Sequence, residues 1–333
     1  MKRFLLINEA IKNSHQDSYF SEENRKSRSA IIFDNILHLI KYGEVNFFYF
    51  LYGLDRLDSN RDEYVDYRSF MISRTVKNKI GTATSQVILL RDKFLFYKYL
   101  SGVGISTPEI FAFEKGGTTF DDKLEINNME LLQPQDDYFA KDNGGECASY
   151  VRRIKKGDKF VFDGNVYPEK GIIFQKALKQ SDELSLLNPS CLNTLRVVTI
   201  NKDGVYYVLA AVLRIGTKAT GNVDNWAAGG IAVAVDENGR LNKYAFYKPG
   251  YGNKVSKHPD TGIVFEEFII SHYADAINLA LKAHSKFYDI HSIGWDIAFT
   301  NDGPTIIEGN DNWEISLMQL CGPLKKQWIN ACN

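Results

Sequence analysis

The sequence predicts an α+β fold, with helices at the start, a series of strands in the middle and one long helix near the end. Three observations lead to this class. Apolar residues recur at helical spacing in roughly the first 85 residues. Short apolar stretches bounded by turn residues follow between residues 109 and 235. A helical stripe over Glu267–Tyr288 then precedes an apolar hairpin, and no repeat of 20 to 50 residues is visible.

Composition indicates an ordinary globular protein. The chain has 333 residues, 40 basic and 41 acidic side chains, and 44% hydrophobic residues. This length allows two or three subdomains, and the balanced charge gives no indication of a nucleic-acid partner. The four cysteines, Cys147, Cys191, Cys321 and Cys332, are scattered as in proteins of a reducing cytosol. The apolar run in MKRFLLINEA is too short for the core of a signal peptide, so we expect a soluble, cytoplasmic protein.

Residues 1–88 are predicted to form a helical accessory domain. Ile32, Ile36 and Ile40 lie at helical spacing, and no Gly-rich strand-to-helix turn indicates a dinucleotide-binding unit. The most apolar run, Val45–Leu54, has about half the length of a membrane-spanning helix. It predicts a buried helix or at most an interfacial segment, so any membrane contact would be peripheral.

The elements after this domain are apolar stretches separated by turn residues. We predict a helix over Arg91–Leu100, then strands over Glu109–Phe113, Tyr138–Lys141, Gly171–Leu178, Leu195–Ile200, Val205–Arg214 and Ile231–Val235. The pair Asp163-Gly164 between two apolar runs is a strong signal for a two-residue β-hairpin.

The stretch Ile293–Asn310 predicts a further hairpin. Asn301-Asp302-Gly303 suits a three-residue loop with glycine in the last, left-handed position. In that register Thr300 faces Pro304. A two-residue loop would shift the pairing and turn the side chains of one strand to the other face.

Three oxygen-bearing side chains share one face of this hairpin: Asp296, Glu308 and Asn310. Asp296 faces Glu308 across the three-residue loop, and Asn310 lies two residues beyond Glu308. Two carboxylates and an amide oxygen, without Cys or His, form a hard-oxygen site that suits Mg²⁺. The alternative is an ordinary hairpin with a solvated acidic face.

Two lysines are candidates for phosphate contacts. Lys141 ends an apolar strand and precedes a loop that contains Gly144 and Gly145, where backbone N–H groups can approach a phosphate. The alternative for this loop is an ordinary turn. Lys93 lies at the start of a helix, where a surface lysine is the default.

Two arginines lie in apolar strands. Arg196 and Arg214 have no acidic neighbour within two residues on their own strand, so an inward-facing guanidinium needs an anion from elsewhere. The alternative is a structural ion pair, for example between Arg214 and Asp224.

The loop that begins at Val223 is of the kind that closes over a ligand. It contains Asp224 and Asn225 and ends with Gly229 and Gly230. Of the histidines, His258 lies in a loop and is a candidate for substrate contact. His284 falls on an apolar helix face and is expected to be a satisfied core residue. No Ser/His/Asp or Cys/His nucleophile pattern is present in the sequence.

Taken in order, these motifs resemble the ATP-grasp enzymes. The run NTLRVVT, VLRIG, VDNWAAGG, GWDIAFT and IIEGN looks most like the ATP-grasp group associated with sugar-transfer gene clusters. It is more loosely similar to the glutamate ligases that modify ribosomal protein and to D-alanine–D-alanine ligases. The resemblance covers about residues 90 to 320. The N-terminal helices depart from the α/β domain that usually precedes this fold.

The resemblance implies an ATP-grasp fold in which two α+β lobes clasp ATP, here residues 89–188 and 189–333. It implies the following site residues: for phosphate, Lys93, Lys141, Gly144 and Gly145; for adenine, the strand Gln175 to Leu178, through the Lys176 carbonyl and the Leu178 N–H; for ribose, either Asp182 or Glu183; for two Mg²⁺ ions, Asp296, Glu308 and Asn310; and for the transferred phosphoryl group, Arg214. From the residues themselves we further expect Arg196 to support the acceptor side. The substrate pocket is expected to contain Asn193, Asp224, Asn225, Gly229, Gly230 and His258. Lys141, Arg196 and Arg214 would be the catalytic cations.

The resemblance further implies an ATP- and Mg²⁺-dependent ligase that joins a small carboxylate to an amine through an acyl phosphate. By analogy with the group, we expect a sugar acid or glycan precursor as substrate, in polysaccharide biosynthesis. One alternative is a kinase of the same fold that phosphorylates a hydroxyl. Another is a non-catalytic, nucleotide-binding scaffold in glycan assembly, which would not need to keep three metal-binding side chains.

Overall fold

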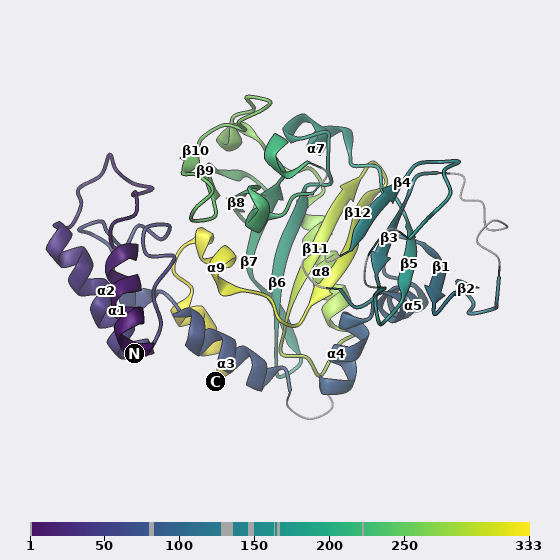
Figure 1. Cartoon of the computed structure of the whole chain (residues 1–333), viewed down its shortest axis with the longest axis horizontal. Helices are drawn as coiled ribbons and strands as arrows, with labels where there is room; N and C mark the ends of the chain where they lie inside the picture. The colour runs from purple at the N-terminus through teal and green to yellow at the C-terminus, as the bar shows by residue number, and fades with distance from the viewer. Residues whose placement is uncertain are drawn as a thin grey trace.

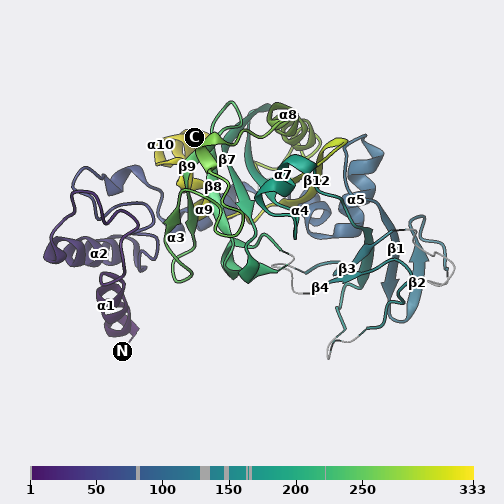
Figure 2. The same ribbon diagram turned by 90° about the horizontal axis from the view of Figure 1, so that it is seen from above.

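The fold contains two antiparallel β-sheets, as a computed structural model of the chain shows (Figure 1). The structure describes residues 2–79, 83–127, 136–145, 150–162, 164, 167–221 and 223–333. One sheet has five strands in the order β2-β1-β5-β3-β4, and the other has seven in the order β10-β9-β8-β7-β6-β11-β12. Segregated helices and antiparallel sheets confirm the predicted α+β class. From above, helices α1 and α2 lie at one end and the five-stranded sheet at the other (Figure 2).

The N-terminal segment is helical in part. Its regular elements are α1 (Lys2–Asn13), α2 (Arg28–Tyr42), the short 3₁₀ helix η1 (Arg61–Glu63) and α3 (Tyr67–Lys77). Helix α2 begins after Ser27, whose hydroxyl accepts a hydrogen bond from the Ala30 N–H, and ends at Gly43 with φ 73°. The long connection after Gly43 consists of turns rather than helix.

The apolar run Val45–Leu54 forms the core of this segment. The predicted helix is wrong here, because the run folds as successive turns with Gly53 at φ 64°. Tyr49, Phe50 and Leu54 are at most 3% exposed, whereas Phe47 is 48% exposed. Side chains that an interfacial segment would offer to lipid are thus turned inward. No helix in the described ranges has the length and hydrophobicity needed to cross a membrane.

Two helices lead into the five-stranded sheet. They are α4 (Ala83–Arg91) and α5 (Lys93–Gly102), and α4 spans the boundary predicted after residue 88. The strands are β1 (Ile110–Lys115), β2 (Thr118–Asp121), β3 (Tyr138–Asp142), β4 (Val151–Ile154) and β5 (Ile172–Lys176). The turn of the hairpin predicted around Asp163-Gly164 lies partly outside the described residues, at 163 and 165–166, and the flanking residues 159–162 form no strand. Cys147 also lies outside the described residues.

The seven-stranded sheet contains the longest strands of the chain. They are β6 (Thr194–Lys202), β7 (Val205–Ile215), β8 (Ile231–Val235), β9 (Leu241–Tyr247), β10 (Lys254–Val255), β11 (Ser292–Thr300) and β12 (Gly303–Asn310). The short elements around it are α7 (Asp182–Leu187), η2 (Lys218–Thr220), η3 (Trp226–Ala228), η4 (Phe265–Glu267), α9 (Ile315–Met318), η5 (Gln319–Cys321) and α10 (Lys325–Cys332).

Helix α8 (Tyr273–His284) covers one face of this sheet. It is shorter than the predicted Glu267–Tyr288, because His272 adopts a left-handed conformation (φ 56°) and the helix begins only after it. Ala276, Ala280 and Ala283 pack with Trp295 in the core on that side. His284 is a satisfied core residue as predicted: it is fully buried, and its Nε2 lies 2.9 Å from the Ile290 carbonyl.

The opposite face of the sheet is covered only in part. Val198, Val212 and other residues of this face pack against α3, α9, α10 and the N-terminal core. Phe70 of α3 joins the two parts, since its ring lies 4.7 Å from the Trp313 ring and 5.0 Å from the Trp328 ring. The uncovered end of the same face carries the polar residues described below.

In the C-terminal hairpin Asp296 pairs with Glu308 as predicted, but the turn and the register differ from the prediction. β11 and β12 are joined by a two-residue turn, so that Thr300 pairs with Gly303, and the predicted three-residue loop is wrong. A register shift beside Asp296 leaves Ile307 unpaired. One inserted residue reverses the alternation of faces, and the bulge therefore returns both carboxylates to the same face.

We expect Phe70→Ala to lower the free energy of unfolding by about 3–5 kcal/mol, the range for removing a buried Phe side chain. The reason is that Phe70 is fully buried between the helical segment and the large sheet. Denaturant unfolding measures this change. Ile72→Ala on the same helix is the control, because Ile72 is 59% exposed and should change stability by no more than about 0.5 kcal/mol. An unchanged unfolding midpoint in Phe70→Ala would mean that the helical segment folds independently.

Candidate functional site

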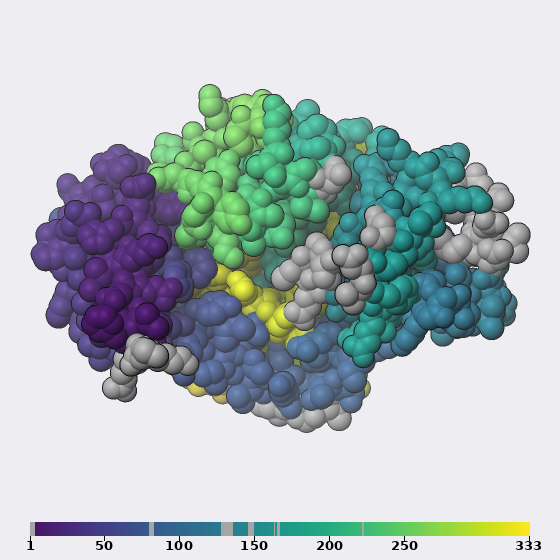
Figure 3. All heavy atoms as spheres, viewed as in Figure 1, coloured from purple at the N-terminus to yellow at the C-terminus, as the bar shows by residue number. Residues whose placement is uncertain are grey.

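A cleft of about 830 Å³ lies between the two sheets. The five-stranded sheet and α5 contribute Lys93, Lys141 and Gln175 to its wall, whereas the seven-stranded sheet contributes Arg196, Arg214, Asp296, Glu308 and Asn310. In the space-filling view, yellow C-terminal residues form the floor of a hollow between the green and blue parts of the surface (Figure 3). Most of the predicted site residues therefore converge from segments far apart in the sequence.

Lys93 is held at the N-terminus of α5 by a loop of the small sheet. Asp92 caps the helix, since its Oδ1 accepts from the Leu95 N–H at 2.9 Å. Asn143 bridges the loop and the helix: its Oδ1 accepts from the Phe94 N–H, and its Nδ2 donates to Asp92 Oδ2, both at 2.9 Å. This docking places Lys93 Nζ 2.6 Å from the Gly145 carbonyl oxygen and 3.8 Å from Glu308 Oε1 across the cleft.

The loop after β3 is built differently from the predicted phosphate cradle. The Gly144 N–H donates to Asp142 Oδ1 at 2.9 Å, and a Cβ on Gly144 would lie 2.2 Å from Lys170 Cδ. Gly145 directs its carbonyl oxygen toward Lys93. A side chain at position 144 would therefore require the flexible end of Lys170 to move. Residues 146–149 are outside the described part of the chain.

Lys141 faces the cleft from the middle of the small sheet. Its ammonium donates to Gln175 Oε1 at 2.7 Å, a side chain on the neighbouring strand β5. Burial lowers the pKa of Lys141 to about 8, and the nearby charge of Lys93 acts in the same direction, whereas Glu308 opposes it. The group is thus cationic at pH 7 but titrates close to neutrality.

Asp296 lies between the two strand arginines. Arg196 is its cross-strand partner and binds it through both Nε and Nη2, the latter at 3.0 Å. Arg214 Nη2 lies 3.2 Å from Asp296 Oδ2, and Arg214 Nε lies 3.4 Å from Asp224 Oδ2. Arg214 also donates to the Thr194 hydroxyl, which in turn donates to Asp224. The arginines are therefore paired with carboxylates from other strands and loops.

The two buried carboxylates respond to this network in opposite ways. Burial tends to raise the pKa of Asp296, but Arg196 and Arg214 outweigh it and hold that pKa below its usual value. Burial raises the pKa of Asp224, and Arg214 offsets this only in part. The four cations Lys93, Lys141, Arg196 and Arg214 face three carboxylates, Asp224, Asp296 and Glu308. The rest of the wall adds the cations Arg153, Lys179 and Lys248 and the carboxylates Asp142 and Glu314. The cleft is therefore positive by two charges and suited to anions.

A magnesium ion would find a smaller ligand set than the sequence predicts. The Glu308 side chain is 36% exposed, and Asn310 donates from Nδ2 to the Gly294 carbonyl, so its Oδ1 remains an acceptor. Both oxygens of Asp296 are occupied by guanidinium groups. In the described ranges, no three His, Cys, Asp or Glu side chains could hold a metal by themselves. Glu308 and Asn310 still fit Mg²⁺, which takes one or two carboxylates with water and phosphate oxygens.

The segment after β5 connects the sheets and lines the cleft with Ala177 and Leu178. The side chain of Lys176 points away, with Nζ 3.5 Å from Asp136. Neither candidate for ribose lies among the cleft residues: Asp182 contacts Asn301, and Glu183 accepts hydrogen bonds from the N–H and hydroxyl of Ser271. Both acids begin helix α7, where acidic residues are favoured.

Only part of the predicted substrate pocket lines the cleft. Asp224 and Asn225 do, and Asn225 caps η3 by accepting from the Ala227 N–H. Gly229 and Gly230 shape the loop instead: Gly229 has φ 99°, and a Cβ on Gly230 would lie 3.0 Å from the Asn225 carbonyl oxygen. They lie outside the cleft wall.

Asn193 and His258 are buried structural residues. Asn193 is 1% exposed, donates to the Leu184 and Asn188 carbonyls and accepts from the Gly216 N–H. His258 is also 1% exposed, with Nε2 2.9 Å from the Gly216 carbonyl. Both satisfy backbone groups around Gly216 and do not line the cleft.

Sequence reasoning missed residues at the other end of the cleft. Trp226, Lys248 and Glu314 line it where it approaches the N-terminal segment. Asn143, which positions Lys93, was also missed. Trp226 follows Asp224-Asn225 directly, so an aromatic residue in a ligand-closing loop could have indicated it. Lys248 and Glu314 have no such local signal.

Comparison with known proteins finds a family match for about half of the chain. Residues 161–325 match the model of a family described as sugar-transfer associated ATP-grasp. The comparison with curated proteins returned no match.

Solved structures show more distant similarities. N5-carboxyaminoimidazole ribonucleotide synthetase from Thermotoga maritima is 13% identical, with a TM-score of 0.40 over 75% of this chain and 49% of that one. D-alanine–D-alanine ligase from Helicobacter pylori is 12% identical, with a TM-score of 0.44 over 74% of this chain and 61% of that one. D-alanyl-alanine synthetase A from Vibrio cholerae is 9% identical, with a TM-score of 0.41 over 73% and 64%. The chain therefore covers less than two thirds of each of these proteins.

The family match falls on the segment that contains Arg196, Arg214, Asp296, Glu308 and Asn310, and it confirms the resemblance found in the sequence. Residues 161–325 of the chain thus match the sugar-transfer associated group of the ATP-grasp superfamily.

Proposed function

We propose that the protein is an ATP- and Mg²⁺-dependent ligase that joins a carboxylate to an amine. One observation supports this most strongly: Lys93 and Lys141 of one lobe face Glu308 and Arg214 of the other across a single cleft. The three cations of this set can bind polyphosphate and stabilise charge during phosphoryl transfer, and Glu308 can hold a metal ion between them and the phosphates. The family match over residues 161–325 supports the ATP-dependent class.

Each cleft residue has a role in this proposal. Lys93 and Lys141 would bind phosphate oxygens, and Gln175 would orient the Lys141 ammonium. Residues Ala177 and Leu178 of the connecting segment would contact the adenine. For the ribose we still propose Asp182 or Glu183, which would require a movement of α7 toward the cleft.

Glu308 and Asn310 would hold Mg²⁺, and Asp296 would join them if Arg214 turned toward the phosphate. The bound ion would neutralise phosphate charge and orient the phosphoryl group. In the structure, Asp296 forms ion pairs with Arg196 and Arg214 and so orients both guanidinium groups. This favours a positioning role for Asp296 before the nucleotide binds.

The proposed reaction has two steps. A carboxylate oxygen of the acid attacks the γ-phosphorus of ATP, the bond to the bridging oxygen breaks, and ADP leaves with the bonding electrons. The amine nitrogen then attacks the carbonyl carbon of the acyl phosphate, loses a proton and expels inorganic phosphate. Arg214 would stabilise charge on the transferred group, and Arg196 would support the acceptor side. Burial of these cations excludes water that would hydrolyse the acyl phosphate.

We propose a sugar acid or glycan precursor as the carboxylate, by analogy with the sugar-transfer associated group. The positive charge of the cleft is consistent with an acid in addition to ATP. The reaction would take place in the cytoplasm, where ATP is available.

A product screen tests the reaction class. We expect uronic acids incubated with ATP, Mg²⁺ and a mixture of amino acids or amino sugars to give ADP, phosphate and an amide, detected by mass spectrometry. A phosphoester with ADP but no free phosphate would indicate a kinase instead. Absence of turnover in a preparation that binds ATP would favour a nucleotide-binding scaffold.

A pH series tests Lys141. Because the pKa of Lys141 is about 8, the ammonium is charged at pH 7 and largely neutral at pH 9. We expect the affinity for a non-hydrolysable ATP analogue with Mg²⁺, measured by calorimetry, to fall about tenfold as pH rises from 7 to 9, following the charged fraction. Lys141→Arg keeps its charge throughout this range and should lose this dependence. An identical fall in wild type and in Lys141→Arg would assign the titration to another group.

Arg214→Ala tests the role of the arginine network. We expect kcat to fall on the order of 10²-fold or more, as for removal of one preorganised charge, with a smaller change in KM for ATP. The substitution also leaves Asp224 and Asp296 with one cation fewer, so the melting temperature should fall as well. The kcat of the folded fraction therefore distinguishes a catalytic from a structural role of Arg214. A kcat near that of the wild type would show that Arg214 is purely structural. Arg91→Ala, which removes the Arg91–Asp311 pair outside the cleft, is the control and should leave kcat unchanged.

A further inference from the structure

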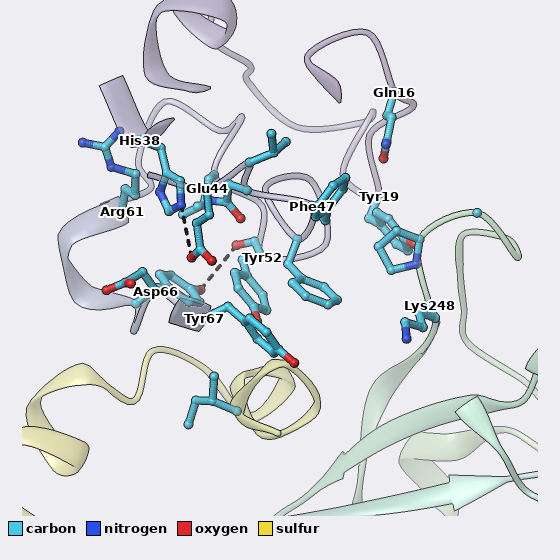
Figure 4. Close-up of a pocket in the computed structure, with 18 of the residues that line it drawn as sticks. Gln16, Tyr19, His38, Glu44, Phe47, Tyr52, Arg61, Asp66, Tyr67 and Lys248 are labelled. Atoms are coloured by element: carbon cyan, nitrogen blue, oxygen red, sulfur yellow. Dashed lines mark hydrogen bonds and ion pairs between the residues drawn. The ribbon is translucent and has the colours of Figure 1, made fainter. Parts of the chain in front are cut away.

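A second cavity, of about 1160 Å³, lies between the N-terminal helical segment and the large sheet (Figure 4). Its volume is sufficient for a ligand the size of a drug molecule. Two of its lining residues, Lys248 and Glu314, also line the cleft. The two cavities are thus adjacent, and these two residues mark their common wall.

Aromatic rings form much of the lining. Tyr64, Tyr52, Phe48 and Trp226 stack in sequence, with centroid distances of 4.9, 5.8 and 6.4 Å. Their interplanar angles are 14°, 24° and 13°. The first three rings line the second cavity, and Trp226 lines the cleft. The aromatic wall is therefore continuous from one cavity to the other.

The second cavity has the opposite charge to the cleft. Its carboxylates are Asp17, Glu44, Asp66 and Glu314, whereas its cationic side chains are Arg61 and Lys248. Neutral donors contact three of these carboxylates: Glu44 accepts from the Arg68 backbone N–H, Asp66 from the Ser69 N–H, and Glu314 from the Tyr67 hydroxyl at 3.2 Å. The cavity therefore carries an excess of two negative charges beside aromatic faces, an environment that attracts ammonium groups.

His38 is a buried side chain of this wall whose ring nitrogens lack hydrogen-bond partners among the described residues. It is 4% exposed. Its Nε2 lies 3.8 Å from Glu44 Oε1, and its ring packs 4.8 Å from that of Tyr42. Figure 4 shows His38 and Glu44 side by side in the cavity lining. A buried polar group without a partner is costly, so a ligand group that hydrogen-bonds here would be favoured.

We propose that this cavity binds the amine substrate of the ligase, as an ammonium-bearing molecule held by Glu44 and the aromatic wall. This inference rests on the proposed function, because it assigns the second of the two substrates. The cleft, with excess positive charge, takes the acid and ATP, and the second cavity, with excess negative charge, takes the amine. The shared residues Lys248 and Glu314 lie where the amine would pass toward the cleft. The N-terminal helical segment is then part of the substrate site.

The test uses glucosamine, ethanolamine and N-acetylglucosamine as probes in saturation-transfer NMR. Glucosamine and its N-acetyl form share the same ring and differ in the charge on nitrogen. We expect the two amines to bind at least about tenfold more tightly than N-acetylglucosamine, the order of one charge-assisted contact. Equal binding of both sugars would indicate recognition of a neutral sugar and would overturn the proposal. Absence of binding by both amines would overturn it too.

Variants of Glu44 locate the binding. Glu44→Gln should weaken glucosamine about tenfold, whereas Glu44→Asp should retain most of the affinity because it keeps the charge. Asp62→Asn is the matched control: it removes an exposed carboxylate of the same segment that does not line the cavity. Melting temperatures exclude misfolded variants. Glucosamine binding that is insensitive to Glu44→Gln would contradict the assignment.

Calorimetry with the Mg²⁺–ATP analogue on the same preparation separates the two proposals. Analogue binding without amine binding would refute the amine site and leave the proposed ligase standing. Amine binding without analogue binding would keep the cavity as an amine site and refute the ATP-dependent function.

Discussion

The pairing of Asp296 with two arginines is the interaction on which the site depends. Arg196, Arg214 and Asp296 come from three neighbouring strands, β6, β7 and β11, and meet on one face of the large sheet. Guanidinium groups cannot lose their charge, so each must be paired inside the protein. The carboxylate of Asp296 provides this partner and gives both arginines a fixed direction. The same face continues as hydrophobic core, where Val198 and Val212 pack against the N-terminal segment.

This network in turn depends on a small irregularity of the backbone. A two-residue turn closes the β11–β12 hairpin, and alternation alone would place Glu308 on the face opposite Asp296. The bulge at Ile307 corrects the alternation and brings Glu308 within 3.8 Å of Lys93 on the other lobe. One inserted residue therefore links the face that carries the arginine network to Lys93 of α5. A bulge next to a functional site is a recurrent way of redirecting a side chain.

The sequence predicted the elements whose signal is local. The strands β6 to β8 follow from apolar runs, and Lys93 lies at the start of a helix as predicted. Residues whose position depends on distant partners could not be assigned. Asn193 and His258 are residue types that often contact ligands, but here they form hydrogen bonds with backbone groups of Gly216. The apolar run Val45–Leu54 lacks a polar face, so its pattern could not distinguish a helix from the packed turns that form.

The second cavity illustrates a limit of a different kind. Its wall combines rings from the N-terminal segment, such as Tyr52 and Phe48, with Lys248 and Glu314 from far along the chain. No sequence motif joins these residues, and only the packing of the helical segment on the large sheet brings them together. Under the proposed function, the acid and the amine have unlike charge and would bind at separate places before the acid is activated. Adjacent cavities of opposite charge would achieve this without a moving part, since each would attract one substrate and repel the other.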